Sequence, residues 1–149
     1  MRKIKKIIIH CSDWEHTGYQ FDEIKKWHID KGWDDIGYHF VIEKDGTVKK
    51  GRDLDVVGAH CRKHNVDSIG VCLAGRRMTD FMPIQFQVMQ QLVRNLCAVF
   101  KDIEEVSPHS AYNDSKTCPN FEIVIIGADN VITYIDESSE LLSNSFLGN

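Results

Sequence analysis

The stretch IIIHCSD, residues 7–13, decides the fold and the place of the site. Three consecutive β-branched residues, Ile7–Ile9, are typical of a strand that is buried on both faces in the middle of a sheet. The sequence changes at once to His10 and further polar residues, so the carboxyl end of this strand opens at the surface. We therefore expect a central strand over residues 4–10 and a functional site where that strand ends.

Helices and strands are interleaved along the rest of the chain. Apolar residues at helical spacing indicate two helices, and Asp45-Gly46 between two strand-like runs indicates a β-hairpin. The expected helices cover residues 21–31 and 83–100, and the expected strands cover residues 38–43, 47–50, 69–74 and 105–109. An antiparallel hairpin combined with long connections predicts an α/β fold, a single domain whose mixed central β-sheet is flanked by helices.

Length and charge argue against a nucleic-acid binder and against a membrane protein. With 149 residues, 42% of them hydrophobic, the chain is long enough for one soluble domain with a substantial core. Its 18 basic and 22 acidic residues give a net charge of −4, whereas a nucleic-acid binder needs a basic face. The apolar runs are far shorter than the roughly 18 residues that span a bilayer. The basic start, Met1–Lys6, leads into His10 and Asp13 without an apolar signal segment, so we expect a cytoplasmic protein.

Metal-capable residues fall where strands are expected to end. The five cysteines include no C-x-x-C pair, so reduced thiols are expected. His10 ends the first strand, while His109 and Cys118 flank a loop after a later one. Imidazole nitrogen and thiolate sulfur are preferred zinc ligands, and three protein ligands with one open position are typical of a catalytic zinc site. The alternative is that each histidine is a hydrogen-bonded surface residue and the cysteine a core filler, and spacing alone leaves both interpretations open.

Seven collinear segments carry a resemblance to a known family. They are IIHCS (8–12), GWDDIGYHFVI (32–42), DGT (45–47), GAH (58–60), Asn65, SIGV (68–71) and KTCPNF (116–121). In this order they resemble the type 2 N-acetylmuramoyl-L-alanine amidases, which include phage lytic amidases and animal peptidoglycan recognition proteins. Several collinear motifs are more specific than any one of them, and the resemblance covers residues 4–123.

The resemblance implies a role for five residues. It implies that His10, His109 and Cys118 bind one zinc ion per chain, and that Tyr38 and Lys116 act near the reacting carbonyl. A tyrosine or lysine there can donate to the oxyanion that forms during hydrolysis. The alternative is that Tyr38 packs on the sheet and Lys116 is a solvated loop residue.

Three further expectations concern the surroundings of the site. Because side chains alternate along a strand, Tyr38 and His39 are expected to face opposite sides, with Tyr38 toward the site. We interpret His60 as a cleft-wall residue that binds substrate and not as a fourth zinc ligand. Residues 1–126 are expected to form the amidase-like domain, and residues 127–149 a tail of unknown role that does not resemble the usual closing helix of the family.

The leading hypothesis is an N-acetylmuramoyl-L-alanine amidase, a zinc hydrolase that cleaves the amide bond between N-acetylmuramic acid and L-alanine in peptidoglycan. As a phage or prophage endolysin, it would wait in the cytoplasm as a monomer and reach the cell wall through a membrane lesion. One alternative is a noncatalytic peptidoglycan-binding module, although such modules commonly lack the cysteine that is present here as Cys118. Two others are a cytosolic amidase that recycles soluble muropeptides and a protein in which the metal only stabilises a loop.

Overall fold

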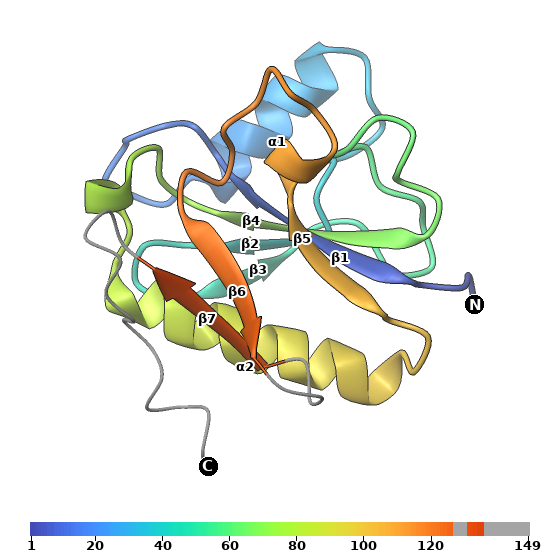
Figure 1. Ribbon diagram of the computed structural model, residues 1–149. Helices are drawn as coiled ribbons and strands as arrows, with labels where there is room; N and C mark the ends of the chain where they lie inside the picture. The colour runs from blue at the N-terminus through green and yellow to red at the C-terminus, as the bar shows by residue number, and fades with distance from the viewer. Residues whose placement is uncertain (127–130, 136–149) are drawn as a thin grey trace.

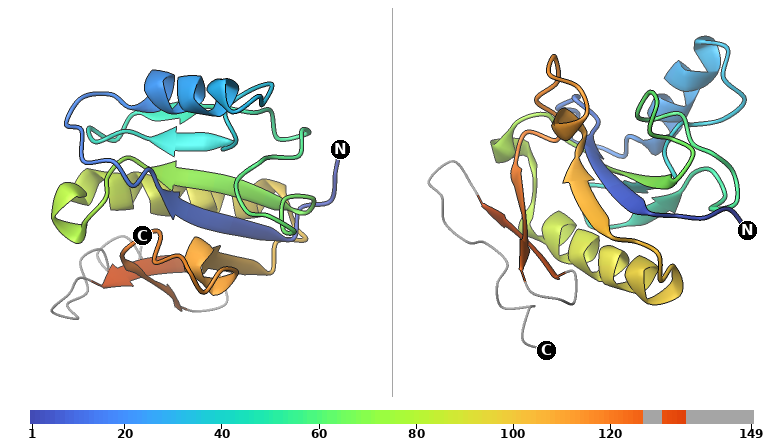
Figure 2. Two further views of the ribbon diagram at one scale, coloured as in Figure 1. Left: turned by 90° about the horizontal axis from the view of Figure 1, so that it is seen from above. Right: turned by 45° about the vertical axis from the view of Figure 1, so that its right-hand side comes forward.

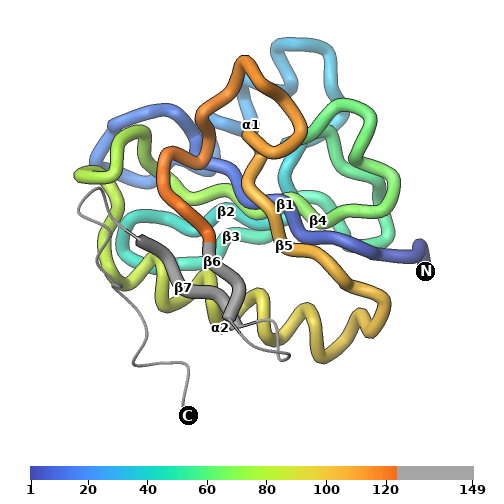
Figure 3. Tube along the Cα trace, viewed as in Figure 1, coloured from blue at the N-terminus to red at the C-terminus, as the bar shows by residue number. Residues whose placement is uncertain are grey.

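The expected central strand, β1 (Lys6–Cys11), lies inside a five-stranded sheet in a computed structural model of the chain (Figure 1). The strand order is β3-β2-β4-β1-β5. β1 is parallel to β4 (Ser68–Leu73) and to β5 (Glu105–Pro108), and β4 is parallel to β2 (Phe40–Ile42). β3 (Val48–Lys50) is antiparallel to β2, which completes the expected hairpin. The sheet is therefore mixed, as predicted, and Figure 3 traces how β1 and β5 meet although they are far apart in sequence.

The two helices cover opposite faces of this sheet (Figure 2). Helix α1 (Phe21–Asp30) ends one residue before the expected range, and the following Gly32 has a φ of +94°, a left-handed conformation that favours glycine. Helix α2 (Pro83–Val99) begins at the proline, as expected. Within the part of the chain that the structure describes, neither helix is long and apolar enough to cross a bilayer.

The structure describes residues 1–126 and 131–135, with only the backbone course given for 124–126 and 131–135. β6 (Glu122–Ile126) and β7 (Val131–Ile135) form a separate antiparallel pair beside α2 (Figure 1). These two strands lie on either side of the expected domain boundary between residues 126 and 127 and pair with each other. The boundary itself stays a prediction. The remainder of the expected tail, 127–130 and 136–149, lies outside the described residues.

Alternation along the strands divides the core into two unequal parts. Ile7 and Ile9 of β1 pack in the larger cluster, together with the apolar face of α2. The smaller cluster joins Ile24 of α1 to Val41 and Cys72 of the sheet. His10 is paired in register with Cys72 and contacts Tyr38, so it lies on the side of the smaller cluster. The site is thus on the α1 face, at the carboxyl end of β1.

The β-hairpin is shorter at its start than the sequence predicts. Strand β2 begins at Phe40, although Tyr38 and His39 belong to the expected strand. The backbone carbonyl of Tyr38 accepts from the N–H of Arg52 at 3.0 Å, and the carbonyl of Gly37 accepts from the N–H of Ala59 at 3.0 Å. These two carbonyls are hydrogen-bonded to the 51–59 segment, whereas the N–H of His39 already donates to the carbonyl of Gly70 in β4 at 2.9 Å.

Glu43 joins the sheet to the start of α1. This carboxylate is 0% exposed and accepts the backbone N–H of Gln20 at 2.9 and 3.1 Å and that of Phe21 at 3.1 Å. Glu43→Ala leaves these N–H groups without their acceptor and is expected to lower the free energy of unfolding by about 1–3 kcal/mol. Urea unfolding followed by circular dichroism measures the change. Glu104→Ala, at an exposed position, is the matched control, and equal stability of the two variants would contradict the assignment.

Candidate active site

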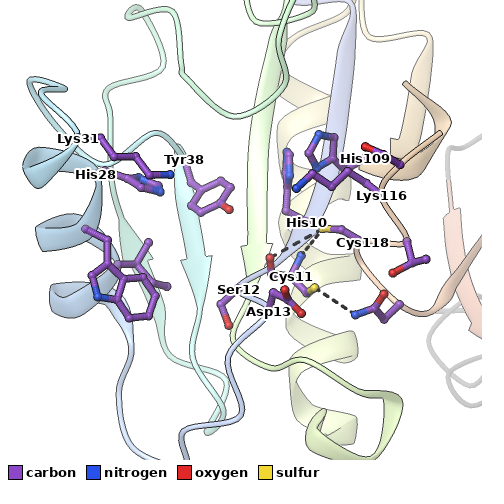
Figure 4. A pocket seen from close by; sticks show the side chains of 15 residues that line it. His10, Cys11, Ser12, Asp13, His28, Lys31, Tyr38, His109, Lys116 and Cys118 are labelled. Atoms are coloured by element: carbon purple, nitrogen blue, oxygen red, sulfur yellow. Dashed lines mark hydrogen bonds between the residues drawn. The ribbon is translucent and has the colours of Figure 1, made fainter. Parts of the chain in front are cut away.

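Three potential metal ligands meet at the carboxyl end of β1 (Figure 4). His10 is near the end of β1, His109 begins the short 3₁₀ helix η2 (His109–Ala111) that follows β5, and Cys118 comes from the next loop. Their ligand atoms all lie within 4.8 Å of one another. The sheet therefore brings His10 and His109 together although they are 99 positions apart, because β1 and β5 are direct neighbours.

Backbone hydrogen bonds hold Cys118 in this cluster. The N–H of Cys11 donates to the Sγ atom of Cys118 at 3.0 Å, and the carbonyl of Cys118 accepts from the N–H of Ser110 at 3.0 Å. The neighbouring Cys11 thiol and burial raise the pKa of the Cys118 thiol. A metal ion binds the thiolate, so binding would release this proton.

Burial keeps the two histidines in the form that binds metals. It lowers the pKa of His10 well below its ordinary value, and the nearby His60 and His109 rings add to the shift. Burial and the positive charge of Lys116 lower the pKa of His109 in the same direction. Neutral imidazole offers a lone pair to a metal, whereas imidazolium does not. Two neutral imidazoles and one thiol match the nitrogen and sulfur donors that zinc prefers, so the residues present fit this metal.

The cluster opens into a pocket of about 590 Å³. This volume is within the range of ligand-binding pockets, about 300–1,000 Å³. One wall carries the three potential ligands, and the facing wall carries side chains of α1 and of the segment before β2 (Figure 4). Among the lining residues are Asp13, Trp27, His28, Lys31, Tyr38, His109, Lys116 and Cys118.

Tyr38 and Lys116 both line the pocket, from opposite walls (Figure 4). The Tyr38 ring lies 5.1 Å from the His10 ring, centroid to centroid. Burial raises the pKa of Tyr38 well above its ordinary value, so its hydroxyl keeps the proton and can donate it in a hydrogen bond. His39 is 0% exposed, and its Nδ1 atom accepts from the N–H of Gly70 at 3.0 Å. Tyr38 is thus among the described residues that line the pocket and His39 is not, while the expectation that the two side chains face opposite sides stays a prediction.

His60 lies behind His10 and not at the pocket wall. Its Nδ1 atom is 2.9 Å from Nε2 of His10, and the described residues that line the pocket do not include it. Burial is the main cause that lowers the pKa of His60 to about 3. The expected role of His60 in substrate binding stays a prediction.

The sequence did not predict that residues of α1 and its end form one wall of the pocket. Trp27 of α1 and Lys31, which directly follows the last residue of the helix, line the pocket. Their spacing of four residues places them on one face, but the sequence alone does not say what that face opposes. His28 of the same helix is 9% exposed, and it also borders the pocket. Its Nδ1 atom accepts from the N–H of Gly37 at 2.8 Å and so ties α1 to the segment that carries Tyr38.

Comparison with known proteins assigns the chain to a family. The family model described as N-acetylmuramoyl-L-alanine amidase matches residues 1–121, which is most of the chain and all of the site. The chain belongs to this family. The resemblance expected from the collinear motifs is confirmed, and so is the predicted enzyme class, an amidase.

Individual relatives agree with this amidase assignment. The endolysin of Escherichia phage T7 is 38% identical over 131 residues, which cover 78% of this chain and 81% of that protein. The amidase LysC from Clostridium intestinale has a TM-score of 0.70 at 27% identity, covering 79% of this chain and 77% of that one. Drosophila PGRP-LB has a TM-score of 0.71 at 27% identity, covering 80% and 76%. The predicted fold, a mixed sheet with flanking helices, is confirmed by these neighbours.

Proposed function

We propose that this amidase is a zinc-dependent endolysin that hydrolyses the bond between N-acetylmuramic acid and L-alanine in peptidoglycan. The observation that carries the proposal is the convergence of His10, His109 and Cys118 at the edge of an open pocket. A relative named endolysin, 38% identical to this chain, supports the lytic role. We further propose that the protein is a monomer and reaches the wall from the cytoplasm through a membrane lesion.

The three candidate ligands have distinct surroundings in this proposal. Zinc bound by them would polarise the scissile carbonyl and lower the pKa of a water molecule to about 7. His10 is only 1% exposed, which fixes its ring between β1 and the neighbouring histidines. His109 and Cys118 are half-buried and come from the segment that borders the pocket.

Tyr38 and Lys116 serve the reacting carbonyl from two sides. The Tyr38 hydroxyl would donate a hydrogen bond to the carbonyl oxygen as that oxygen gains negative charge. The Lys116 ammonium would add a positive charge on the opposite wall. Donors that are in place before the reaction stabilise the developing negative charge without any rearrangement of the site, and this preorganisation lowers the energy of the transition state.

Two other functions remain as outcomes of the test. A peptidoglycan-binding module would occupy the same pocket without hydrolysis, but Cys118, which completes the donor set, favours an enzyme. A cytosolic recycling amidase would cleave soluble muropeptides and leave cross-linked walls intact. The choice between lysis and recycling therefore depends on the physical state of the substrate.

Digestion of purified cross-linked peptidoglycan tests the proposal directly. We expect new amino groups of L-alanine without new reducing sugar ends, because an amidase separates peptide from glycan while a glycosidase cuts the sugar chain. Mass spectrometry of the fragments, with a chelator-treated sample as control, identifies the bond. New reducing ends without new amines would contradict the proposal. Cleavage of soluble muropeptides alone would indicate recycling, and binding without products would indicate a recognition module.

A further inference from the structure

His60 occupies the middle of a hydrogen-bonded chain that starts at the metal cluster. Its Nδ1 atom is 2.9 Å from Nε2 of His10, and its Nε2 atom is 3.2 Å from Oγ of Ser68. The Ser68 hydroxyl is 2.6 Å from the backbone carbonyl of His64. The chain therefore runs from a potential metal ligand through a second histidine and a serine to a fixed backbone acceptor.

The direction of each hydrogen bond follows from the last acceptor. A backbone carbonyl has no proton, so the Ser68 hydroxyl donates its proton to His64. The Ser68 oxygen must then accept from Nε2–H of His60. A neutral imidazole carries one proton, so Nδ1 of His60 is an acceptor and receives Nε2–H of His10. Nδ1 of His10 is left as the nitrogen with a free lone pair.

We propose that His60 is a positioning residue that holds His10 in the Nε2-protonated tautomer and so presents Nδ1 to the metal. The inference rests on the proposed zinc site. A ligating histidine whose second nitrogen donates to a fixed partner keeps its ring orientation, and loss of such a partner costs about 10–100-fold in metal affinity. Ser68, at the start of β4, orients His60 in turn.

The position of His60 is fixed by hydrogen bonds to its backbone and by close packing of its ring on β4. The Asn65 side-chain oxygen accepts the backbone N–H of both His60 and Cys61, each at 2.9 Å. The ring packs directly over Gly70 of β4, where a Cβ atom would lie 2.5 Å from Cγ of His60. Gly70 has no side chain to displace the ring, so the sheet itself provides the space for the His60 contact with His10.

The tautomers are measurable in the metal-free protein. Two-bond proton–nitrogen correlations in ¹⁵N-labelled protein separate protonated from unprotonated ring nitrogens. We expect protons on Nε2 of His10 and on Nε2 of His60, with Nδ1 bare in both rings. A proton on Nδ1 of His10 in the folded wild-type protein would overturn the inference. The measurement does not depend on zinc, so it stays informative even if the proposed zinc function fails.

Zinc affinity of two His60 variants tests the consequence. His60→Leu removes the acceptor, and we expect zinc affinity, measured by competition with a chromophoric chelator, to fall by about 10–100-fold. His60→Asn keeps an oxygen acceptor near the position of Nδ1 and is expected to recover most of the affinity. His16→Leu, at an exposed histidine, is the matched control and should bind zinc like the wild type. Circular dichroism of the metal-free variants confirms that each is folded.

Distinct results separate positioning from substrate binding. An unchanged zinc affinity in His60→Leu together with a raised KM would overturn the inference and favour the cleft-wall role. Equal losses of affinity in His60→Leu and His60→Asn would also overturn it, because ring packing and not the acceptor would then matter. Gly70→Ala is an independent test, because it keeps His60 but places a methyl group where the His60 ring lies and so displaces the ring from His10. We expect a loss of zinc affinity like that of His60→Leu.

Discussion

Cys118→Ser is expected to remove zinc binding and hydrolysis together. A hydroxyl is a poorer zinc ligand than a thiolate, and the substitution leaves the two histidines as the remaining donors of the cluster. Zinc affinity should fall by more than about 100-fold, since loss of an outer partner of a ligand alone costs about 10–100-fold. Metal content by elemental analysis and kcat on peptidoglycan measure the two effects on the same sample.

Cys97→Ser is the matched control for this substitution. Cys97 lies on α2, packs against the larger core cluster and is not among the described residues that line the pocket. We expect this variant to keep both its zinc and its kcat. If Cys118→Ser retained stoichiometric zinc and full kcat, the proposed ligand set would be wrong.

Tyr38→Phe and Lys116→Ala are expected to lower kcat without loss of metal. Each removes one donor that faces the pocket, and removal of a single donor to a developing oxyanion costs about 10²–10³-fold in kcat. The first variant removes only a hydroxyl, so the ring contact with His10 at 5.1 Å is kept. Steady-state kinetics on cross-linked peptidoglycan, with zinc content measured in parallel, separates catalysis from metal binding.

Lys101→Ala controls for the loss of a positive charge, because Lys101 is exposed and lies after α2, away from the pocket. Full kcat in Tyr38→Phe or Lys116→Ala would remove the catalytic role from that residue. Loss of zinc from either variant would reassign the residue to the structure of the metal site.

The metal cluster and the sheet were predictable because their signals are local. The isoleucine run of β1 and the Pro83 start of α2 indicate elements within short windows of sequence. His10 and His109 stand at the ends of expected strands, whereas Cys118 lies in a loop and was indicated by the order of the family motifs along the chain.

The surroundings of the cluster depend on contacts that no short window contains. His60 meets His10 because Gly70, on a neighbouring strand, leaves space for its ring. Trp27 lines the pocket because α1 is held over the sheet by Glu43 and His28, each bonded to a distant backbone group. Periodicity indicates that such residues share a face, but the residue opposite that face is set by tertiary packing.

The two faces of β1 serve different properties of this enzyme: one face contributes to its thermal stability and the other to its active site. Ile7 and Ile9 point into the large cluster under α2, while His10 points to the pocket side. Substitutions under α2 that spare the neighbourhood of Cys118, which also packs against that cluster, can therefore raise thermal stability without changing the His10 side of β1. Insertion or deletion of one residue in β1 before His10 would instead damage the site, because a shift of one residue exchanges the two faces of the strand and would turn His10 toward the larger cluster.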